Sequence, residues 1–240
     1  MVDPDEGVAP DGTIVTGARR ERVPPVFEPV IEAAVEATRG ASLYLYGSVA
    51  TGQARVGRSD VDLLSTGPVD AGPELSRRFA GLCRGVEIGV ARPATCADEA
   101  YGNRVFLRHY CVQLSGPPRT DLDVRHPADA RAARGFNGDI ARHARRWRAG
   151  GVTPQRLARK TLLAVAGLVS VHDRTWTTDR TGAARRWAQL RPELADDLET
   201  LVTWIESDQP RTGPMMDGLV AAVVEEFAET IGLWPDQPAR

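Results

Sequence analysis

The segment 43–62 constrains the fold of this chain more than any other part of it. It opens with the apolar run LYLY at residues 43–46, which predicts a short strand, and Gly47-Ser48 then breaks that strand. A polar loop rich in Gly and Arg leads to Asp60-Val61-Asp62, after which apolar residues resume. Alternate side chains of a strand share a face, so the two Asp carboxylates project together while the Val between them points into the core.

Two carboxylates on one face repel each other, so this pair needs positive charge close by. Mg²⁺ binds carboxylate oxygens and the phosphates of a nucleoside triphosphate at the same time. We therefore expect Asp60 and Asp62 to hold Mg²⁺, as two ions. Gly47 lets the backbone approach a phosphate, and Ser48 adds a hydroxyl and an amide at a turn. A polar loop end, in which Ser59 and Asp60 cap a turn, is the structural alternative.

The order of these elements resembles the signature of the DNA-polymerase-β-type nucleotidyltransferase superfamily. Helical spacing predicts a helix over Val26–Arg39, which Gly40 ends, and an amphipathic helix over Glu74–Arg84. The β-branched run Val86–Ala91 predicts a further strand. Helix, strand, strand, helix, strand is the layout of the small α/β catalytic domain in that superfamily. The resemblance implies an enzyme that uses a metal and a nucleoside triphosphate, with ATP as co-substrate.

A third carboxylate follows in the last of these strands. In the streptomycin/spectinomycin adenylyltransferases, which the chain resembles most, a Glu on the strand after the second helix acts as the general base. Glu87 matches that position, and on a strand it faces away from the neighbouring Val and Ile side chains. The resemblance implies that Glu87 contacts the acceptor and takes the proton of its hydroxyl. An ordinary solvent-facing charge is the alternative. The rival carboxylates, in more polar surroundings, are Asp98, Glu99, Asp121 and Asp123.

The second half of the chain is helical in pattern. Ile140–Arg148 predicts a basic helix, and the strongly apolar Leu157–Val171 predicts a buried one. Shorter helices are expected over Gly182–Leu190, Leu194–Ile205 and Val220–Ile231. The predicted fold class is an α/β N-terminal nucleotidyltransferase domain, with a mixed sheet flanked by helices, plus an all-α C-terminal helical bundle.

Composition suggests where the domains divide. Residues 1–22 begin acidic and turn-rich, which predicts a mobile N-terminal tail. A polar stretch from Gly116 to Ala128 contains three Pro residues and predicts a boundary. We therefore expect the catalytic domain at residues 23–126 and a helical substrate-binding domain at residues 127–235.

The helical half resembles the same adenylyltransferases more loosely. In that family a buried helix and a loop precede a short helix with Ala-Ala before a Trp-Ala step, and residues 183–188 (AARRWA) follow this plan. The family carries acids near that Trp that face the cationic drug, whereas this chain has Gly182, Arg185 and Arg186. Two arginines would repel an aminoglycoside. Acids elsewhere, such as Asp179 or the Asp196-Asp197 pair, could take their place.

Several other side chains are candidates for contact with the ligands. Arg55, Arg58 and Lys160 could neutralise phosphates, and we retain Arg58 and Lys160 as nucleotide-binding residues. A solvated surface charge is the alternative for each, with the stem of Lys160 reaching to water. Trp176 and Trp187 could stack on a base or a sugar as substrate-binding residues, and placement in the core is the alternative.

Composition favours a soluble, cytoplasmic enzyme with no membrane partner. Hydrophobic residues make up 42% and charged residues 26% of the 240 residues. The start of the chain lacks the basic and apolar regions of a signal peptide, and no apolar run is long enough to span a bilayer. Cys83, Cys96 and Cys111 have neither paired nor metal-ligand spacing, which predicts free thiols in a reducing cytoplasm.

Three functions stay open at this point. The first is transfer of AMP from Mg-ATP onto a hydroxyl of a small molecule, which by resemblance is an aminoglycoside-type antibiotic. The second keeps the transfer but takes a nucleic-acid end, a protein or another metabolite, and the Arg-rich stretch 131–191 favours it. The third is a non-catalytic, nucleotide-binding regulatory protein. One catalytic core serves many acceptors, so the fold alone does not choose between them.

Overall fold

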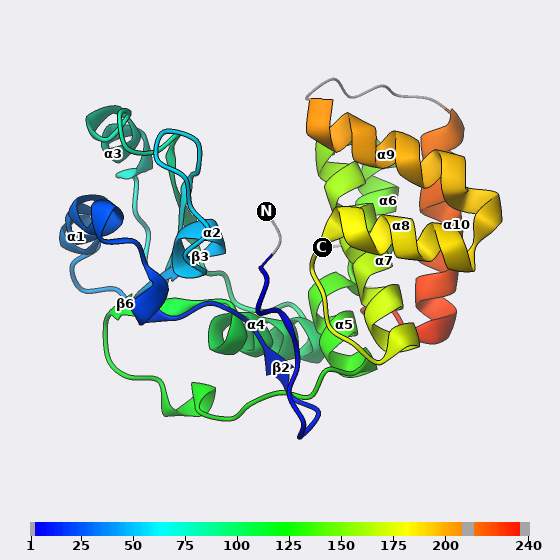
Figure 1. Cartoon of the computed structure of the whole chain (residues 1–240), viewed down its shortest axis with the longest axis horizontal. Helices are drawn as coiled ribbons and strands as arrows, with labels where there is room; N and C mark the ends of the chain where they lie inside the picture. The colour runs from blue at the N-terminus through cyan, green and yellow to red at the C-terminus, as the bar shows by residue number, and fades with distance from the viewer. Residues whose placement is uncertain (1–2, 208–213, 236–240) are drawn as a thin grey trace.

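The structure, a computed structural model, describes residues 3–207 and 214–235. An α/β part built on a four-stranded sheet lies beside a helical part, and the N-terminal segment enters between them (Figure 1). The predicted fold class is confirmed: a mixed sheet with flanking helices comes first, and a mostly helical region follows. Among the described residues, no helix is both long and apolar enough to cross a membrane.

The sheet consists of β3 (Leu43–Tyr46), β4 (Val61–Ser65), β5 (Val86–Val90) and β6 (Val112–Ser115). Its strand order is β5-β4-β3-β6. β4 pairs with β5 in parallel, whereas β3 pairs with both β4 and β6 in antiparallel fashion. The short loop between β3 and β4 is compatible with antiparallel pairing, and the parallel pair is joined through a helix, as parallel strands require.

One face of the sheet carries a hydrophobic core that two helices cover, α1 (Glu28–Ala37) and α3 (Gly72–Arg78) (Figure 1). Val61 and Leu63 of β4 are fully buried in this core. The residues between and after them, which point to the opposite face, are half-buried. The expected alternation along this strand is therefore observed, and it leaves the second face of the sheet open toward the helical half.

Both of these helices are shorter than the sequence predicted. Residues Pro25–Phe27 form a 3₁₀ turn, so α1 begins at Glu28 and not at Val26, with a Pro in its first turn. Pro is tolerated there because the first N–H groups of a helix have no partner within it. α3 ends at Arg78 and not at Arg84. The carbonyl of Phe79 accepts hydrogen bonds from the amides of residues 82 and 83, which turns the chain toward β5.

Helix α4 (Ala97–His109) connects the two halves, and the sequence reading missed it (Figure 1). Asp98 and Glu99, expected in loop-like surroundings, lie in its first turn, where carboxylates favour a helix N-terminus. Two of its buried residues, Tyr101 and Val105, belong to the core of the helical half. The domain boundary between residues 126 and 127 stays a prediction.

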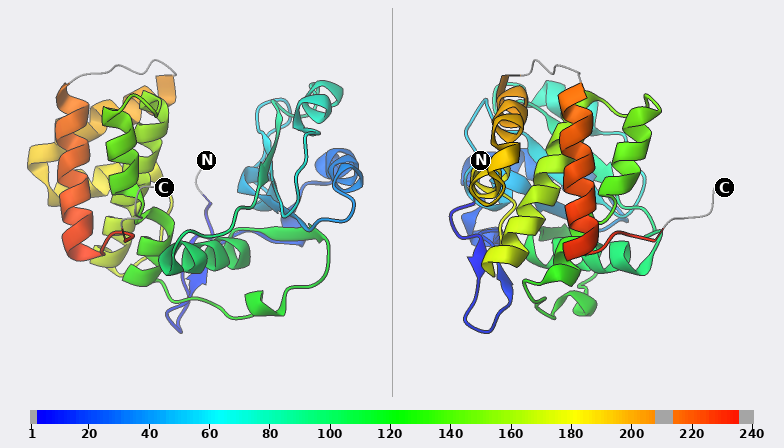
Figure 2. Two further views of the ribbon diagram at one scale, coloured as in Figure 1. Left: turned by 180° about the vertical axis from the view of Figure 1, so that it is seen from behind. Right: turned by 90° about the vertical axis from the view of Figure 1, so that its right-hand side faces the viewer.

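The helical half surrounds one long helix, α7 (Pro154–Asp173), as Figure 2 shows from behind and from the side. Its neighbours are α5 (Ala130–Asn137), α6 (Ile140–Arg148), α8 (Arg180–Leu190), α9 (Ala195–Ser207) and α10 (Pro214–Thr230). Thr153 caps α7 by accepting the amide of Arg156 at 3.3 Å, and Arg174 ends it with a left-handed backbone conformation (φ 54°). The helices expected in this half are present, with bounds that differ by a few residues.

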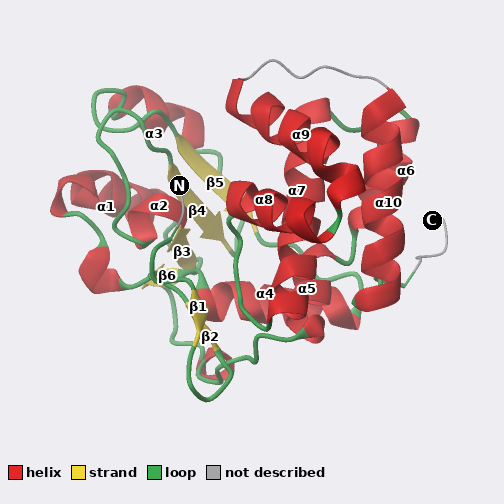
Figure 3. Ribbon diagram, turned by 45° about the vertical axis from the view of Figure 1, so that its right-hand side comes forward, coloured by secondary structure: helices red, strands yellow, loops and turns green. Residues whose placement is uncertain are grey.

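The sequence predicted a mobile tail over residues 1–22, but the structure places the described part of this segment against both halves. β1 (Gly7–Val8) pairs with β2 (Ile14–Val15), as Figure 3 shows. Ile14 is 1% exposed and belongs to the core of the helical half. Thr13 forms a β-bridge with Pro127. An apolar side chain and backbone pairing therefore hold a segment whose acidic composition suggested mobility.

Helices α4 and α5 cross at a pair of glycines, and this crossing generates a prediction for stability. A Cβ on Gly102 would lie 2.2 Å from the carbonyl oxygen of Gly135. We expect Gly102→Ala to lower the free energy of unfolding by about 2 kcal/mol, because backbone overlap outweighs the better helix propensity of Ala. Gly218→Ala on α10 is the matched control. Nothing lies within 4 Å of a Cβ there, so we expect it to raise that free energy by up to about 1 kcal/mol. Urea unfolding measures both, and equal effects would contradict the close crossing.

Candidate functional site

A cleft of about 440 Å³ lies between the α/β part and the helical part. Residues of β4 and of the turn after β3 form one wall, and residues 178–180 before and at the start of α8 form another. Asp3 and Glu6 of the N-terminal segment also line it. The expected residues Gly47, Ser48, Arg58, Asp60 and Asp62 all line this cleft, so the structure brings together the predicted nucleotide-binding and metal-binding residues of the α/β part.

The sheet pairing sets the position of the central carboxylates. Asp62 lies opposite Tyr46 of β3 and opposite Glu87 of β5. Side chains that face each other across paired strands project to the same side of the sheet, so Asp62 and Glu87 share its open face. Glu87 is exposed and lies outside the residues that line the cleft. The alternation predicted for Asp60 and Asp62 puts both at the cleft, next to this open face.

Burial and neighbouring negative charges together shift the pKa of Asp62. Burial, followed by the negative charges of Glu87 and Asp60, raises the pKa of Asp62 to about 6, and Arg84 opposes the rise. A shift in this direction means that the ionised form of Asp62 is poorly solvated and is repelled by its neighbours. A bound cation would relieve both effects.

The turn that follows β3 requires glycine at its first position. Gly47 has a positive φ of 73°. A Cβ at this position would lie only 2.5 Å from Oδ2 of Asp62. A side chain would therefore be strained by the backbone conformation and would also overlap the carboxylate. Gly47 and Asp62 form one unit in the cleft, although they are fifteen residues apart in the sequence.

Asp60 has an arginine partner that the sequence reading did not find. Nε of Arg84 donates to Oδ1 of Asp60 at 3.0 Å, and a second nitrogen of Arg84 pairs with Oδ2. Arg84 also lines the cleft. Arg84 lies just before β5, and Asp60 lies just before β4. Because β4 and β5 pair in parallel, these two residues are neighbours, and the amide of Arg84 donates to the carbonyl of Ser59. The contact therefore depends on the strand order, which the sequence alone does not report.

The carboxylates in the cleft fit a divalent cation, since their oxygens are the ligands that Mg²⁺ takes. Within residues 3–207 and 214–235, no three His, Cys, Asp or Glu side chains form a ready-made metal cluster. Asp60 is already neutralised by Arg84, whereas Asp62 faces two like charges. Asp62 is therefore the carboxylate whose environment most favours a cation, and Asp60 would join it on release from Arg84.

Glu6 ties three parts of the chain together at the cleft. Its carboxylate accepts hydrogen bonds from the hydroxyl of Tyr110, from the amide of Thr178 at 2.6 Å and from the hydroxyl of Thr178 at 2.8 Å. The indole of Trp176 in turn donates to the Tyr110 hydroxyl at 2.7 Å. Burial raises the pKa of Glu6, although these hydrogen bonds lower it. The sequence offered no signal for this role, because Glu6 lies in the segment expected to be mobile.

Three residues predicted to contact ligands lie elsewhere. Nζ of Lys160 donates to the carbonyl of Phe136 at 2.8 Å and pairs with Asp139 at 2.6 Å, so its charge is used inside the helical half. Trp176 and Trp187 are only 5% and 2% exposed and belong to the helical core. The core alternative therefore describes both indoles, and burial leaves neither ring open for stacking on a substrate.

The two arginines that would repel a cationic drug also lie outside the cleft. Arg186 donates to both oxygens of Asp173, at 2.8 and 3.0 Å. Arg185 lines a separate hollow between α8 and α9. By contrast, the neighbouring Asp179 lines the cleft and caps α8 by accepting the amide of Gly182 at 3.1 Å. The Asp196-Asp197 pair lies in the first turn of α9 and does not line the cleft.

The raised pKa of Asp62 predicts how stability depends on pH. The folded state holds the Asp62 proton up to about pH 6, whereas an unfolded Asp releases it near 3.8, so ionisation destabilises the fold as the pH rises through this range. With metal chelated, we expect Asp62→Asn to be more stable than wild type at pH 8 by about 1–2 kcal/mol, discounted for partial exposure. The difference should shrink as the pH falls and vanish well below the unfolded pKa of 3.8, at about pH 3.

Urea unfolding at several pH values measures this difference. Asp70→Asn, at an exposed carboxylate, is the control and should change the free energy of unfolding by less than about 0.5 kcal/mol at any pH. An Asp62→Asn variant that is no more stable than wild type at pH 8 would contradict the account of carboxylate repulsion.

Comparison with known protein families points to the same part of the chain, the α/β wall of the cleft. No curated protein matches the chain. Residues 30–92 match the model of the nucleotidyltransferase domain family. The matched range runs from α1 to the end of β5 and includes Gly47, Ser48, Asp60, Asp62 and Glu87. The match supports the DNA-polymerase-β-type superfamily, and with it a transferase with nucleotidyl-transfer activity.

Proposed function

We propose that this protein transfers a nucleoside monophosphate, AMP from Mg-ATP, onto a hydroxyl group of a small molecule. One observation carries the proposal: in the segment that matches the nucleotidyltransferase model, the carboxylate of Asp62 lies against Gly47 and beside Asp60, and its pKa is raised to about 6. Carboxylates that repel each other can bind the metal of a metal-triphosphate complex, and a glycine turn beside them lets the backbone approach its phosphates.

Five residues of the α/β wall have a proposed role: Gly47, Ser48, Arg58, Asp60 and Asp62. Asp60 and Asp62 would hold Mg²⁺, as two ions, and bound metal would offset the charge that develops on the leaving pyrophosphate. The backbone at Gly47 and the hydroxyl of Ser48 would contact phosphate oxygens. Arg58 is exposed at the same cleft and would add positive charge near the phosphates.

Glu87 would act as the general base. Its register opposite Asp62 supports this role, because it puts a third carboxylate on the face where the α-phosphorus would lie. The attacking hydroxyl would pass its proton to Glu87 as the new O–P bond forms and the bond to pyrophosphate breaks. The exposure of Glu87 suits a residue that meets an acceptor arriving from solvent.

An aminoglycoside-type antibiotic is the acceptor that we propose first. The cleft has acidic side chains beyond the catalytic pair, namely Asp3, Glu6 and Asp179, and these would attract ammonium groups. The arginines that argued against a cationic acceptor, Arg185 and Arg186, are directed to other parts of the helical half. The two arginines that the sequence set against a cationic acceptor therefore do not line the proposed site.

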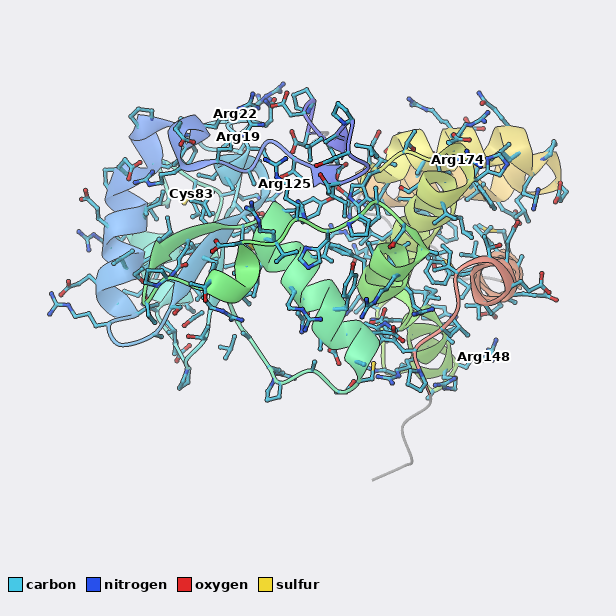
Figure 4. All side chains as sticks on the ribbon, turned by 90° about the horizontal axis from the view of Figure 1, so that it is seen from below. Arg19, Arg22, Cys83, Arg125, Arg148 and Arg174 are labelled. Carbon is cyan, nitrogen blue, oxygen red and sulfur yellow. The ribbon has the colours of Figure 1, made fainter. Side chains whose placement is uncertain are left out.

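A nucleic-acid end is the second candidate acceptor, and a cluster of arginines around α4 favours it. Burial lowers the pKa of both His109 and His126, and the positive charges of nearby arginines lower it further: Arg104, Arg108, Arg125 and Arg131 each act on one or both histidines. Figure 4 shows Arg125 beside one end of α4. Such a cluster would attract phosphate groups. A non-catalytic nucleotide-binding protein is the remaining alternative, and loss of all transfer with retained nucleotide binding would identify it.

We expect Asp62→Asn and Asp60→Asn each to reduce pyrophosphate release from Mg-ATP at least hundredfold while leaving the circular dichroism spectrum unchanged. The reason is that each substitution removes a charged metal ligand and keeps the shape of the side chain. Asp123→Asn, at an exposed carboxylate outside the cleft, is the matched control and should keep full activity. Full activity in either site variant would refute the metal assignment.

The two acceptor classes separate in the same assay. We expect streptomycin or spectinomycin to stimulate pyrophosphate release by wild type, and we expect Glu87→Gln to abolish the stimulation because the base is lost. Single-stranded oligonucleotides serve as the competing acceptor. Stimulation by oligonucleotides alone, with loss on Arg104→Gln and Arg108→Gln, would reject the antibiotic and support a nucleic-acid acceptor.

A further inference from the structure

Arg180 is a half-buried cation on the helical side of the cleft. It is the first residue of α8, and it lines the same cleft as Ser48, Asp60 and Asp62. Arg180 forms no hydrogen bond or salt bridge with any residue that the structure describes. Other arginines of this half do have partners: Arg134 pairs with Asp98, Arg186 with Asp173 and Arg191 with Glu226.

The surroundings of Arg180 do not compensate its charge. Burial and the like charge of Arg159 lower the pKa of Arg180, and only Asp179 acts in the opposite direction. The carboxylate of Asp179 already accepts the amide of Gly182 and so caps the N-terminus of α8. A guanidinium that is partly removed from water and lacks a carboxylate partner is unfavourable by itself. An anion that enters the cleft would supply the missing partner through charge-assisted hydrogen bonds.

The segment that carries Arg180 is held in place from two sides. Glu6 accepts both the amide and the hydroxyl of Thr178, two residues before Arg180. The hydroxyl of Ser170 on α7 accepts the amide of Thr177 at 3.0 Å. These bonds fix the backbone just before α8. Arg180 is therefore presented to the cleft by a fixed backbone, which lowers the entropy lost when it binds a ligand.

We infer that Arg180 binds the terminal phosphates of the nucleotide from the helical side of the cleft, and that Glu6 positions it by holding Thr178. This inference rests on the proposed function and assigns to Arg180 the role that the sequence suggested for Lys160. The triphosphate then lies between two walls, with the carboxylates and Ser48 on one side and Arg180 on the other. One triphosphate would then contact both halves of the molecule, whereas AMP lacks the terminal phosphates that Arg180 would bind.

Isothermal titration calorimetry with inorganic tripolyphosphate tests Arg180 directly. We expect Arg180→Gln to weaken binding about 10- to 100-fold, as loss of a charge-assisted hydrogen bond predicts. Arg185→Gln, on the same helix but outside the cleft, is the matched control and should bind as wild type does. Mg-ATP should follow the same pattern, whereas AMP should bind wild type and Arg180→Gln equally. Equal weakening of AMP, or no weakening of tripolyphosphate, would overturn the assignment.

A double-mutant cycle tests the positioning role of Glu6. We expect Glu6→Gln to weaken tripolyphosphate binding, because the amide cannot accept all the hydrogen bonds that the carboxylate accepts. If Glu6 acts through Arg180, the double variant should bind no more weakly than Arg180→Gln alone. Additive losses would overturn the positioning role, since they would mean that Glu6 affects binding by an independent route.

The two proposals fail in distinguishable ways. Tripolyphosphate binding that depends on Arg180, together with a failure of wild type to bind Mg-ATP, would keep the anion site and reject the nucleotidyltransferase function. Mg-ATP binding that depends on Asp62 but is indifferent to Arg180→Gln would keep the function and reject Arg180 as a phosphate ligand.

Discussion

Repulsion between carboxylates on one face of a mixed sheet is the constraint on which the site depends. The parallel register of β4 and β5 sets Asp62 opposite Glu87, and the period of the strand brings Asp60 to the same cleft. The two Asp carboxylates differ in how their negative charge is compensated. Arg84 neutralises Asp60, whereas Asp62 has no ion-pair partner among the residues that the structure describes, and its pKa rises. The contact of Asp62 with Gly47 also leaves no room for a side chain at that turn.

The N-terminal segment completes the cleft and ties its two walls together. Glu6 accepts hydrogen bonds from Tyr110, which directly follows α4, and from Thr178, just before α8. Through these bonds the half-buried carboxylate of Glu6 links the segment after α4 to the segment before α8. This arrangement helps to explain why residues from three distant parts of the chain line one cleft.

The sequence predicted the parts of the molecule that local patterns determine. The alternation of residues 60–64 and the Gly47-Ser48 break depend on the two-residue period of strands and on backbone sterics, and both are present. The helical half follows the same logic, because helical spacing reports which residues are buried. The sequence did not predict helix α4, because its first turn is polar and its buried face consists of only a few residues.

Tertiary partners decided the rest of the site, and no local pattern reports them. Arg84 reaches Asp60 only through the pairing of β4 with β5. Lys160 looked available for phosphates, yet its ammonium is used by Asp139. Arg180 had no distinguishing pattern in an arginine-rich stretch, and only the fold shows that it has no hydrogen-bond or ion-pair partner in the described part of the chain. The acidic N-terminus suggested mobility for a similar reason. The hydrogen bonds that hold Glu6 come from two donors in distant segments, Tyr110 and Thr178, which no local pattern reports.

A crystal structure of the protein with Mn²⁺ and a non-hydrolysable ATP analogue tests the central claim most directly, because anomalous scattering locates the metal without reference to activity. The account predicts Mn²⁺ between Asp60 and Asp62, with the phosphates extending past Ser48 toward Arg180. Mn²⁺ elsewhere, or a nucleotide bound outside the cleft while Asp62 stays without a metal, would contradict it.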